Sequence, residues 1–190
     1  MTTGHDAVTV QGAARARSGR RLISIPLGAL VVAAAAQVAV PVPLSPVPMT
    51  LQPLAVLAVG GLLGAQAGMA SLVLYLALGV AGLPVFAGGS SGLVHLLGPT
   101  GGYLLAFPLA AGLTGALATP AAGVLRVLLA CALGMVVIHA GGVAQLALLG
   151  GDPAVAFRIG FVPFFTGDLL KVGLAAAAIL AGRTVIRRAN

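Results

Sequence analysis

The amino-acid sequence predicts an all-α membrane protein, folded as a single bundle of six transmembrane helices. Of its 190 residues, 59% are hydrophobic and only 7% are charged, and the mean hydropathy is +1.13, which is too apolar for a soluble domain of this length. The apolar runs are continuous, whereas the strands of a membrane β-barrel would alternate in polarity. At about 20 residues for each span plus short loops, the chain has room for at most about six or seven helices.

Six apolar segments are expected to span the membrane, at residues 22–40, 50–63, 68–83, 102–118, 124–148 and 160–181. They form one membrane domain, residues 22–182, between a basic cytoplasmic tail at 1–21 and another at 183–190. The first span ends before four prolines, which oppose a helix and predict a stiff, extended connection: Pro41, Pro43, Pro46 and Pro48. A glycine-rich stretch at 83–102 predicts irregular backbone, which is tolerated at membrane depth only inside protein or beside a cavity.

The arginines predict the orientation of the bundle. With both termini in the cytoplasm, only Arg158 lies outside, and the arginines that lie inside are Arg15, Arg17, Arg20, Arg21, Arg126, Arg183, Arg187 and Arg188. The net charge of +7 therefore indicates membrane orientation, so membrane lipid is expected as a partner and nucleic acid is not. The abundance of alanine, glycine and arginine indicates a GC-rich bacterial genome. The expected location, given the predicted spans, is the cytoplasmic (inner) membrane, as a multi-pass protein.

The most informative feature is an acid and a base three residues apart in the last apolar segment, Asp168 and Lys171. A charge at membrane depth costs about 2.5 to 3.5 kcal/mol on insertion scales, so a pair kept there suggests a polar task. The spacing places both side chains on one face of a helix. They could form a structural ion pair that neutralises itself, or they could bind a ligand that has adjacent donors and acceptors. Pro163 and Gly167 favour the second interpretation, because they loosen the helix beside the acid.

Other polar residues in the apolar segments give weaker signals. Gln52 and Tyr103 lie one or two residues into a predicted span, where each could donate to a ligand or anchor its helix at the membrane surface. His95 is interpreted as a solvated or gate residue of the glycine-rich loop, and His139 as a hydrogen-bonded core residue. No carboxylate or thiolate spacing supports a metal site, no nucleotide-hydrolysis motif is present, and the single cysteine, Cys131, is expected to pack in the core.

Four segments resemble the signature segments of one known family, in order and with matching topology. They are residues 46–52 (PVPMTLQ), 82–89 (GLPVFAGG), 97–104 (LGPTGGYL) and 167–171 (GDLLK). The family is BioY, the biotin-binding substrate component, or S component, of energy-coupling factor (ECF) transporters. The resemblance covers about residues 22 to 182. Two positions depart from the family pattern, Pro53 after Gln52 and Pro108 in the fourth span, and both concern local helix geometry.

The resemblance implies a non-enzymatic subunit that takes up biotin from outside, together with a transmembrane scaffold protein and a pair of ATPases, and that needs no cofactor. It implies that Asp168 accepts a hydrogen bond from a ureido N–H, while Lys171 donates to the ureido oxygen or, alternatively, to the valerate carboxylate. The expected walls of the ligand site are Gln52, Tyr103, Phe86, Gly88 and Gly89, and the expected surface for docking on the scaffold is formed by Ala29 and Ala33.

Two alternatives remain open from the sequence. The chain could be a small proton-coupled secondary transporter in which Asp168 carries the coupling proton, although it shows no clear internal repeats. It could also be an S component for another vitamin.

Overall fold

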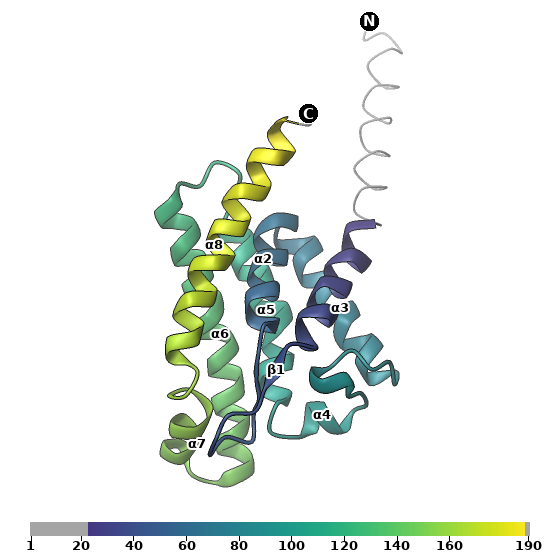
Figure 1. Cartoon of the computed structure of the whole chain (residues 1–190), viewed down its shortest axis with the longest axis vertical. Helices are drawn as coiled ribbons and strands as arrows, with labels where there is room; N and C mark the ends of the chain where they lie inside the picture. Colours follow the sequence, from purple (N-terminus) through teal and green to yellow (C-terminus); the bar gives the residue numbers. More distant parts are fainter. Residues whose placement is uncertain (1–22, 189–190) are drawn as a thin grey trace, which may run out of the picture.

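The computed structural model describes residues 23–188, which form a helical bundle with one short hairpin (Figure 1). The predicted tail at 1–21 lies outside the described residues, and so do the last two residues of the tail predicted at 183–190, whose first part continues the last helix. The elements in chain order are a first helix Ile23–Ala36, β1 Ala39–Val40, β2 Met49–Thr50, α2 Gln52–Leu63, α3 Ala65–Val80, the 3-10 turn η1 Ala87–Gly89, α4 Val94–Leu97, α5 Gly101–Leu117, α6 Val124–Gly150, α7 Pro153–Gly160 and α8 Phe165–Arg188.

The long helices alternate in direction along the chain. As a result, the start of the first described helix and the end of α8 lie at the same end of the bundle, and the hairpin, α4 and α7 gather at the opposite end (Figure 1). The turn between α2 and α3 is made by Gly64, whose φ of 81° is a conformation that glycine adopts without strain. The hairpin and the irregular residues at 81–100 thus lie at the end of the bundle remote from the end of α8, while the short turns at Gly64 and 118–123 lie at the same end as the end of α8 (Figure 1).

Two helices are long and apolar enough to cross a membrane by length and composition, α6 and the Phe165–Thr184 part of α8. Four shorter apolar helices accompany them: Ile23–Ala36, Gln52–Leu63, Ala65–Val80 and Gly101–Leu117. Each of these has fewer than the roughly 20 residues that a straight span needs. The apolar segments of the sequence thus became helices as predicted, and several of the helices are shorter than a full span.

Two predicted segments differ from the structure by more than a few residues at their ends. The proline-rich connection after the first helix was predicted to be extended, but it turns back on itself and pairs Ala39 with Thr50 and Val40 with Met49 in an antiparallel hairpin. The sixth segment is not a continuous helix from residue 160, because α7 ends at Gly160 and α8 begins at Phe165. Pro163 accounts for this break, since its ring removes a backbone donor and keeps the preceding residue from the helical region.

Close packing holds α5 in the centre, where it contacts α2, α3 and α6. Glycines allow the closest approach: a Cβ on Gly102 would meet the backbone oxygen of Gly141, and a Cβ on Gly142 would meet the ring of Tyr103. Neither of the two prolines that depart from the family pattern, Pro53 and Pro108, breaks a helix. Pro53 lies in the first turn of α2, where a missing N–H costs nothing, and α5 continues past Pro108.

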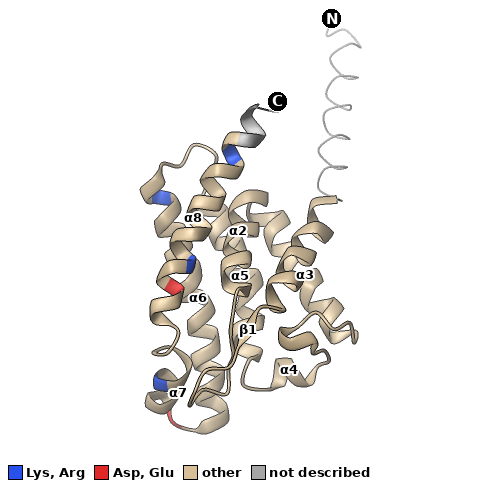
Figure 2. Ribbon diagram, viewed as in Figure 1, with Lys and Arg blue, Asp and Glu red and all other residues tan. Residues whose placement is uncertain are grey.

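Charged residues are sparse in this bundle. Figure 2 shows a red and a blue position next to each other in the middle of the bundle, on α8, while most of the ribbon is tan. These positions belong to the pair that the sequence singled out, Asp168 and Lys171, which are both 6% exposed. The bundle therefore surrounds an acid and a base with apolar side chains.

Candidate ligand-binding site

A cavity of about 300 Å³ lies in the half of the bundle that holds the hairpin, η1 and α4. Its wall combines the hairpin tip with the starts of α2, α5 and α8 and the middle of α6. The volume is at the lower end of the range of about 300 to 1,000 Å³ that is usual for small-molecule sites. Most of the wall is apolar, and the larger apolar side chains in it are Phe86, Leu104, Phe107, Ile138 and Phe164.

Asp168 lies in the first turn of α8 and faces this cavity. Its backbone N–H donates to the oxygen of Phe164 over 2.9 Å, which ties it to the turn that precedes the helix. The positive end of the helix dipole stabilises a carboxylate at this position. The break before α8 thus does more than shorten a span, because it places the acid at a helix start beside the cavity.

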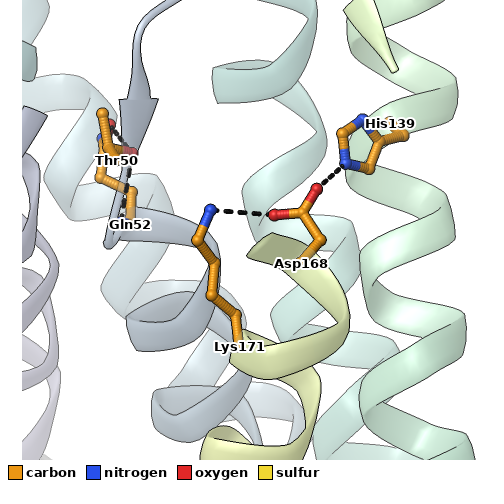
Figure 3. A network of polar contacts seen from close by, with 5 residues as sticks. All are labelled: Thr50, Gln52, His139, Asp168 and Lys171. Carbon is orange, nitrogen blue, oxygen red and sulfur yellow. Dashed lines mark hydrogen bonds and ion pairs between the residues drawn. The ribbon is translucent and has the colours of Figure 1, made fainter. Parts of the chain in front are cut away.

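Lys171 forms an ion pair with Asp168, and its Nζ donates to Oδ1 over 2.9 Å (Figure 3). An ammonium group has three hydrogens to donate. Among residues 23–184, Asp168 is its one hydrogen-bond partner, so two donors remain for a molecule in the cavity. The pair therefore satisfies itself in part and keeps the capacity to bind a ligand.

His139 also belongs to the site, although the sequence did not indicate it as a site residue. Its Nε2 lies 2.5 Å from Oδ2 of Asp168, so the acid is held from α6 as well as from its own helix (Figure 3). The ring packs against Tyr103 and Phe161, with ring centres 5.8 and 5.1 Å away. The prediction that His139 is a hydrogen-bonded core residue is confirmed, but its partner is the central acid. The 29 residues between the two give no local spacing that could have revealed the contact.

Gln52 lines the cavity at the start of α2, where it also joins a chain of hydrogen bonds. Its Oε1 accepts from the hydroxyl of Thr50 over 3.1 Å, and its Nε2 donates to the hydroxyl of Tyr75 over 2.6 Å. Tyr75 donates in turn to the oxygen of Val85 over 3.1 Å. Gln52 therefore links the hairpin to the segment that carries Phe86, besides forming part of the wall.

Tyr103 lines the cavity with its ring, while its hydroxyl donates to the oxygen of Gly160 over 2.6 Å. This bond fastens the end of α7 to α5 and so fixes the turn before α8. Phe86 is 2% exposed, and it packs edge-on against Tyr75 and His95. His95 itself lines the cavity, and its interpretation as a gate residue remains a prediction.

Four of the nominated residues do not line this cavity. Gly88 and Gly89 follow Phe86 in η1 with φ values of 67° and 71°, so they shape the turn that carries it. Ala29 is 2% exposed, and Ala33 is half-buried against the same core, so both lie on the side of the first helix that faces the bundle. Docking of a scaffold on these two alanines remains a prediction, and it would require that side to become accessible. In the described part of the chain, no three His, Cys, Asp or Glu side chains gather as metal ligands would.

The fold and the site define a class: a helical membrane protein with a small-molecule cavity, beside which an acid, a base and a histidine are joined by hydrogen bonds. The comparisons with known proteins then give the family. The family model described as "BioY family" matches residues 8–188, and the chain belongs to this family, as the four segments predicted. BioY is a family of transporter components and not of enzymes, which agrees with the prediction for this chain.

Relatives and a solved structure agree with the family. A probable biotin transporter BioY of Pyrococcus horikoshii is 42% identical over 142 residues, which cover 75% of this chain and 83% of the relative. The biotin transporter BioY of Thermotoga maritima is 40% identical over 139 residues, covering 73% and 82%. The crystal structure of the S-component for biotin from an ECF-type ABC transporter superposes with a TM-score of 0.80 and 26% identity, covering 90% of this chain and 93% of the other.

Proposed function

We propose that this chain binds biotin from outside the cell and acts as the S component of an ATP-driven ECF-type importer. The observation that carries the proposal is the buried pair of Asp168 and Lys171 beside a cavity of ligand size. The printed names of the relatives, which are biotin transporters, support the choice of ligand.

The polar edge of biotin fits the chemistry of this pair. Its ureido ring has N–H donors next to a C=O acceptor, so it offers what a carboxylate and an ammonium group each need. Asp168 would accept from a ureido N–H, and Lys171 would donate one of its remaining hydrogens to the ureido oxygen. Hydrogen bonds to charged groups are roughly twice as strong as neutral ones. Such bonds inside an apolar cavity suit a protein that captures a scarce vitamin.

The rest of the cavity fits the rest of the ligand. Phe86, Phe107, Ile138 and the ring of Tyr103 would pack against the apolar ring and chain of biotin, and Gln52 would form a polar part of the wall. Gly88 and Gly89 would act by shaping the turn that carries Phe86. Position supports these roles, because each residue either lines the cavity or shapes the turn that carries a lining residue.

Six membrane spans and two cytoplasmic ends are part of the proposal. The six apolar helices support the count, and their alternating directions would put both ends of the chain on one side of the membrane. Arg126 at the start of α6 and Arg183 near the end of α8 would then lie on the cytoplasmic side, in agreement with the positive-inside rule. The energy for transport would come from a scaffold protein and a pair of ATPases in the same membrane, since the sequence has no nucleotide-hydrolysis motif of its own.

A binding titration tests the proposal. The purified full chain in detergent is titrated in separate experiments with biotin, riboflavin and thiamin, and the heat of binding is recorded. We expect saturable binding of one biotin for each chain, with a dissociation constant below about 1 μM, equivalent to about 8 kcal/mol. The other two vitamins should show no saturable binding in the same range. Tighter binding of either one than of biotin would contradict the proposal.

A further inference from the structure

The contact between His139 and Asp168 constrains the acid in a way that the ion pair alone does not. The two residues come from different helices, α6 and α8, and Nε2 of the imidazole lies 2.5 Å from Oδ2. A carboxylate can only accept, so the imidazole must carry a hydrogen on Nε2 and donate it. Lys171 meanwhile donates to the other oxygen, Oδ1. Each oxygen of Asp168 therefore already has one donor from the protein.

The imidazole is held in place by its surroundings. His139 is 7% exposed, and its ring lies among the rings of Tyr103, Phe161 and Phe164. Its second nitrogen, Nδ1, is buried without a hydrogen-bond partner among the described residues. A polar atom left unpaired in a core is a cost, so the ring is placed here for the bond that its other nitrogen makes.

We propose that His139 determines ligand specificity by acting through Asp168, an inference that rests on the proposed binding of biotin. By donating to Oδ2 while Lys171 donates to Oδ1, the imidazole fixes the rotation of the carboxylate. Each oxygen keeps one acceptor position, but the group cannot turn both oxygens toward one ligand. The site then accepts a neutral edge in which an N–H lies beside a C=O, as in a urea. It rejects a cationic guanidinium edge, because such a group binds a carboxylate best through two parallel hydrogen bonds.

Two substitutions separate this role from simple packing. His139→Phe keeps a ring among the aromatic neighbours and removes the donor to Asp168, while His139→Gln keeps an N–H donor at nearly the same distance from the backbone. His139→Leu also removes the donor but has a side chain of a different shape. It replaces His139→Phe in the test if the Phe variant does not fold. Size-exclusion profile and melting temperature show which variants are folded.

The probes are biotin and its analogue in which the ureido oxygen is replaced by an imino group, a cyclic guanidine that is cationic at neutral pH. Both are titrated into the full-length chain in detergent, and the measured quantity is the ratio of their dissociation constants. We expect the wild-type protein to prefer biotin by at least about 100-fold, since the guanidinium cannot use both oxygens and lies near the ammonium of Lys171. In the variants without a donor, His139→Phe and His139→Leu, the preference for biotin over the analogue should be at least about tenfold smaller than in the wild type. In His139→Gln this preference should stay within about threefold of the wild-type value.

The possible outcomes are distinct. If the donor-less variants weaken the binding of both probes by the same factor, or leave the ratio unchanged, His139 is a packing residue and the inference is overturned while the proposed function stands. If the wild-type chain does not bind biotin, the proposed function fails and this inference fails with it.

Discussion

Replacing Asp168 by asparagine changes the site at its centre while keeping the size of the side chain. In the structure the carboxylate accepts from Lys171 on one oxygen and from His139 on the other. Asparagine keeps one of these oxygens and puts an NH₂ donor in place of the second, so one protein donor loses its acceptor. A ligand N–H then meets a neutral acceptor where it met a charged one. Hydrogen bonds to charged groups contribute about 1.5 to 3 kcal/mol and neutral ones about 0.5 to 1.5.

The difference of about 1 to 2 kcal/mol corresponds to a loss of biotin affinity of about 5- to 30-fold, and we expect about tenfold or more. The variant should also be less stable, because it leaves the buried ammonium of Lys171 without a counter-charge, a change that typically costs about 3 to 5 kcal/mol. Isothermal titration gives the affinity, and thermal unfolding followed by circular dichroism gives the melting temperature. A second variant, Asp168→Asn with Lys171→Met, removes both charges and should recover part of the stability without recovering binding.

A matched control is available on α7. Asp152 is exposed, and it caps that helix by accepting from the backbone N–H groups of Ala154 and Val155. Asparagine is an equally good cap, so Asp152→Asn makes the same chemical change and should leave both affinity and melting temperature unaltered. The reasoning would be refuted if the folded Asp168→Asn variant bound biotin within about threefold of the wild-type affinity. Replacing a hydrogen bond to a charged acceptor by one to a neutral acceptor must reduce the affinity by more than about threefold.

Three further predictions concern the hydroxyl of Tyr103, the packing at Gly142 and the source of energy for transport. Tyr103→Phe should lower the melting temperature, because the hydroxyl donates a hydrogen bond to the oxygen of Gly160. The same change should weaken biotin binding by less than about threefold in a titration. A larger loss of affinity would mean that the hydroxyl contacts the ligand. Gly142→Ala should destabilise the protein in a thermal melt more than Gly173→Ala does, because a Cβ at Gly142 would meet the ring of Tyr103 while a Cβ at Gly173 has open space. Uptake of labelled biotin by cells that also express a scaffold and ATPases should continue when an uncoupler is added and ATP is maintained, and its collapse would favour proton coupling through Asp168.

The helices and the central pair could be predicted from the sequence because both signals are local. Long apolar runs mark the helices, and an acid and a base three residues apart stand out in such a run without knowledge of the rest of the fold. Prolines and glycines also marked where the helices end. The hairpin was missed because the strands are two residues long, too short to leave an alternating pattern. The break before α8 was missed because apolar residues on both sides of Pro163 look like one continuous span.

The partners within the site could not be predicted, because they come from distant parts of the chain. His139 meets Asp168 only when α6 packs beside α8, and Gln52 meets Tyr75 only when α2 packs beside α3. Gly88 and Gly89 were assigned to the wall of the site because they belong to the segment that resembles the family, 82–89. In the structure they lie outside the cavity lining and have the positive φ angles of a turn. Sequence reasoning thus found the residues that carry charge, and the structure was needed to find what holds them.

The structure of the protein with biotin bound tests the central claim most directly. The account predicts that a ureido N–H lies within about 3.2 Å of a carboxylate oxygen of Asp168 and that the ureido oxygen lies within the same distance of Nζ of Lys171. A structure in which biotin lies elsewhere, or in which Lys171 contacts the valerate carboxylate while Asp168 contacts only protein, would contradict it.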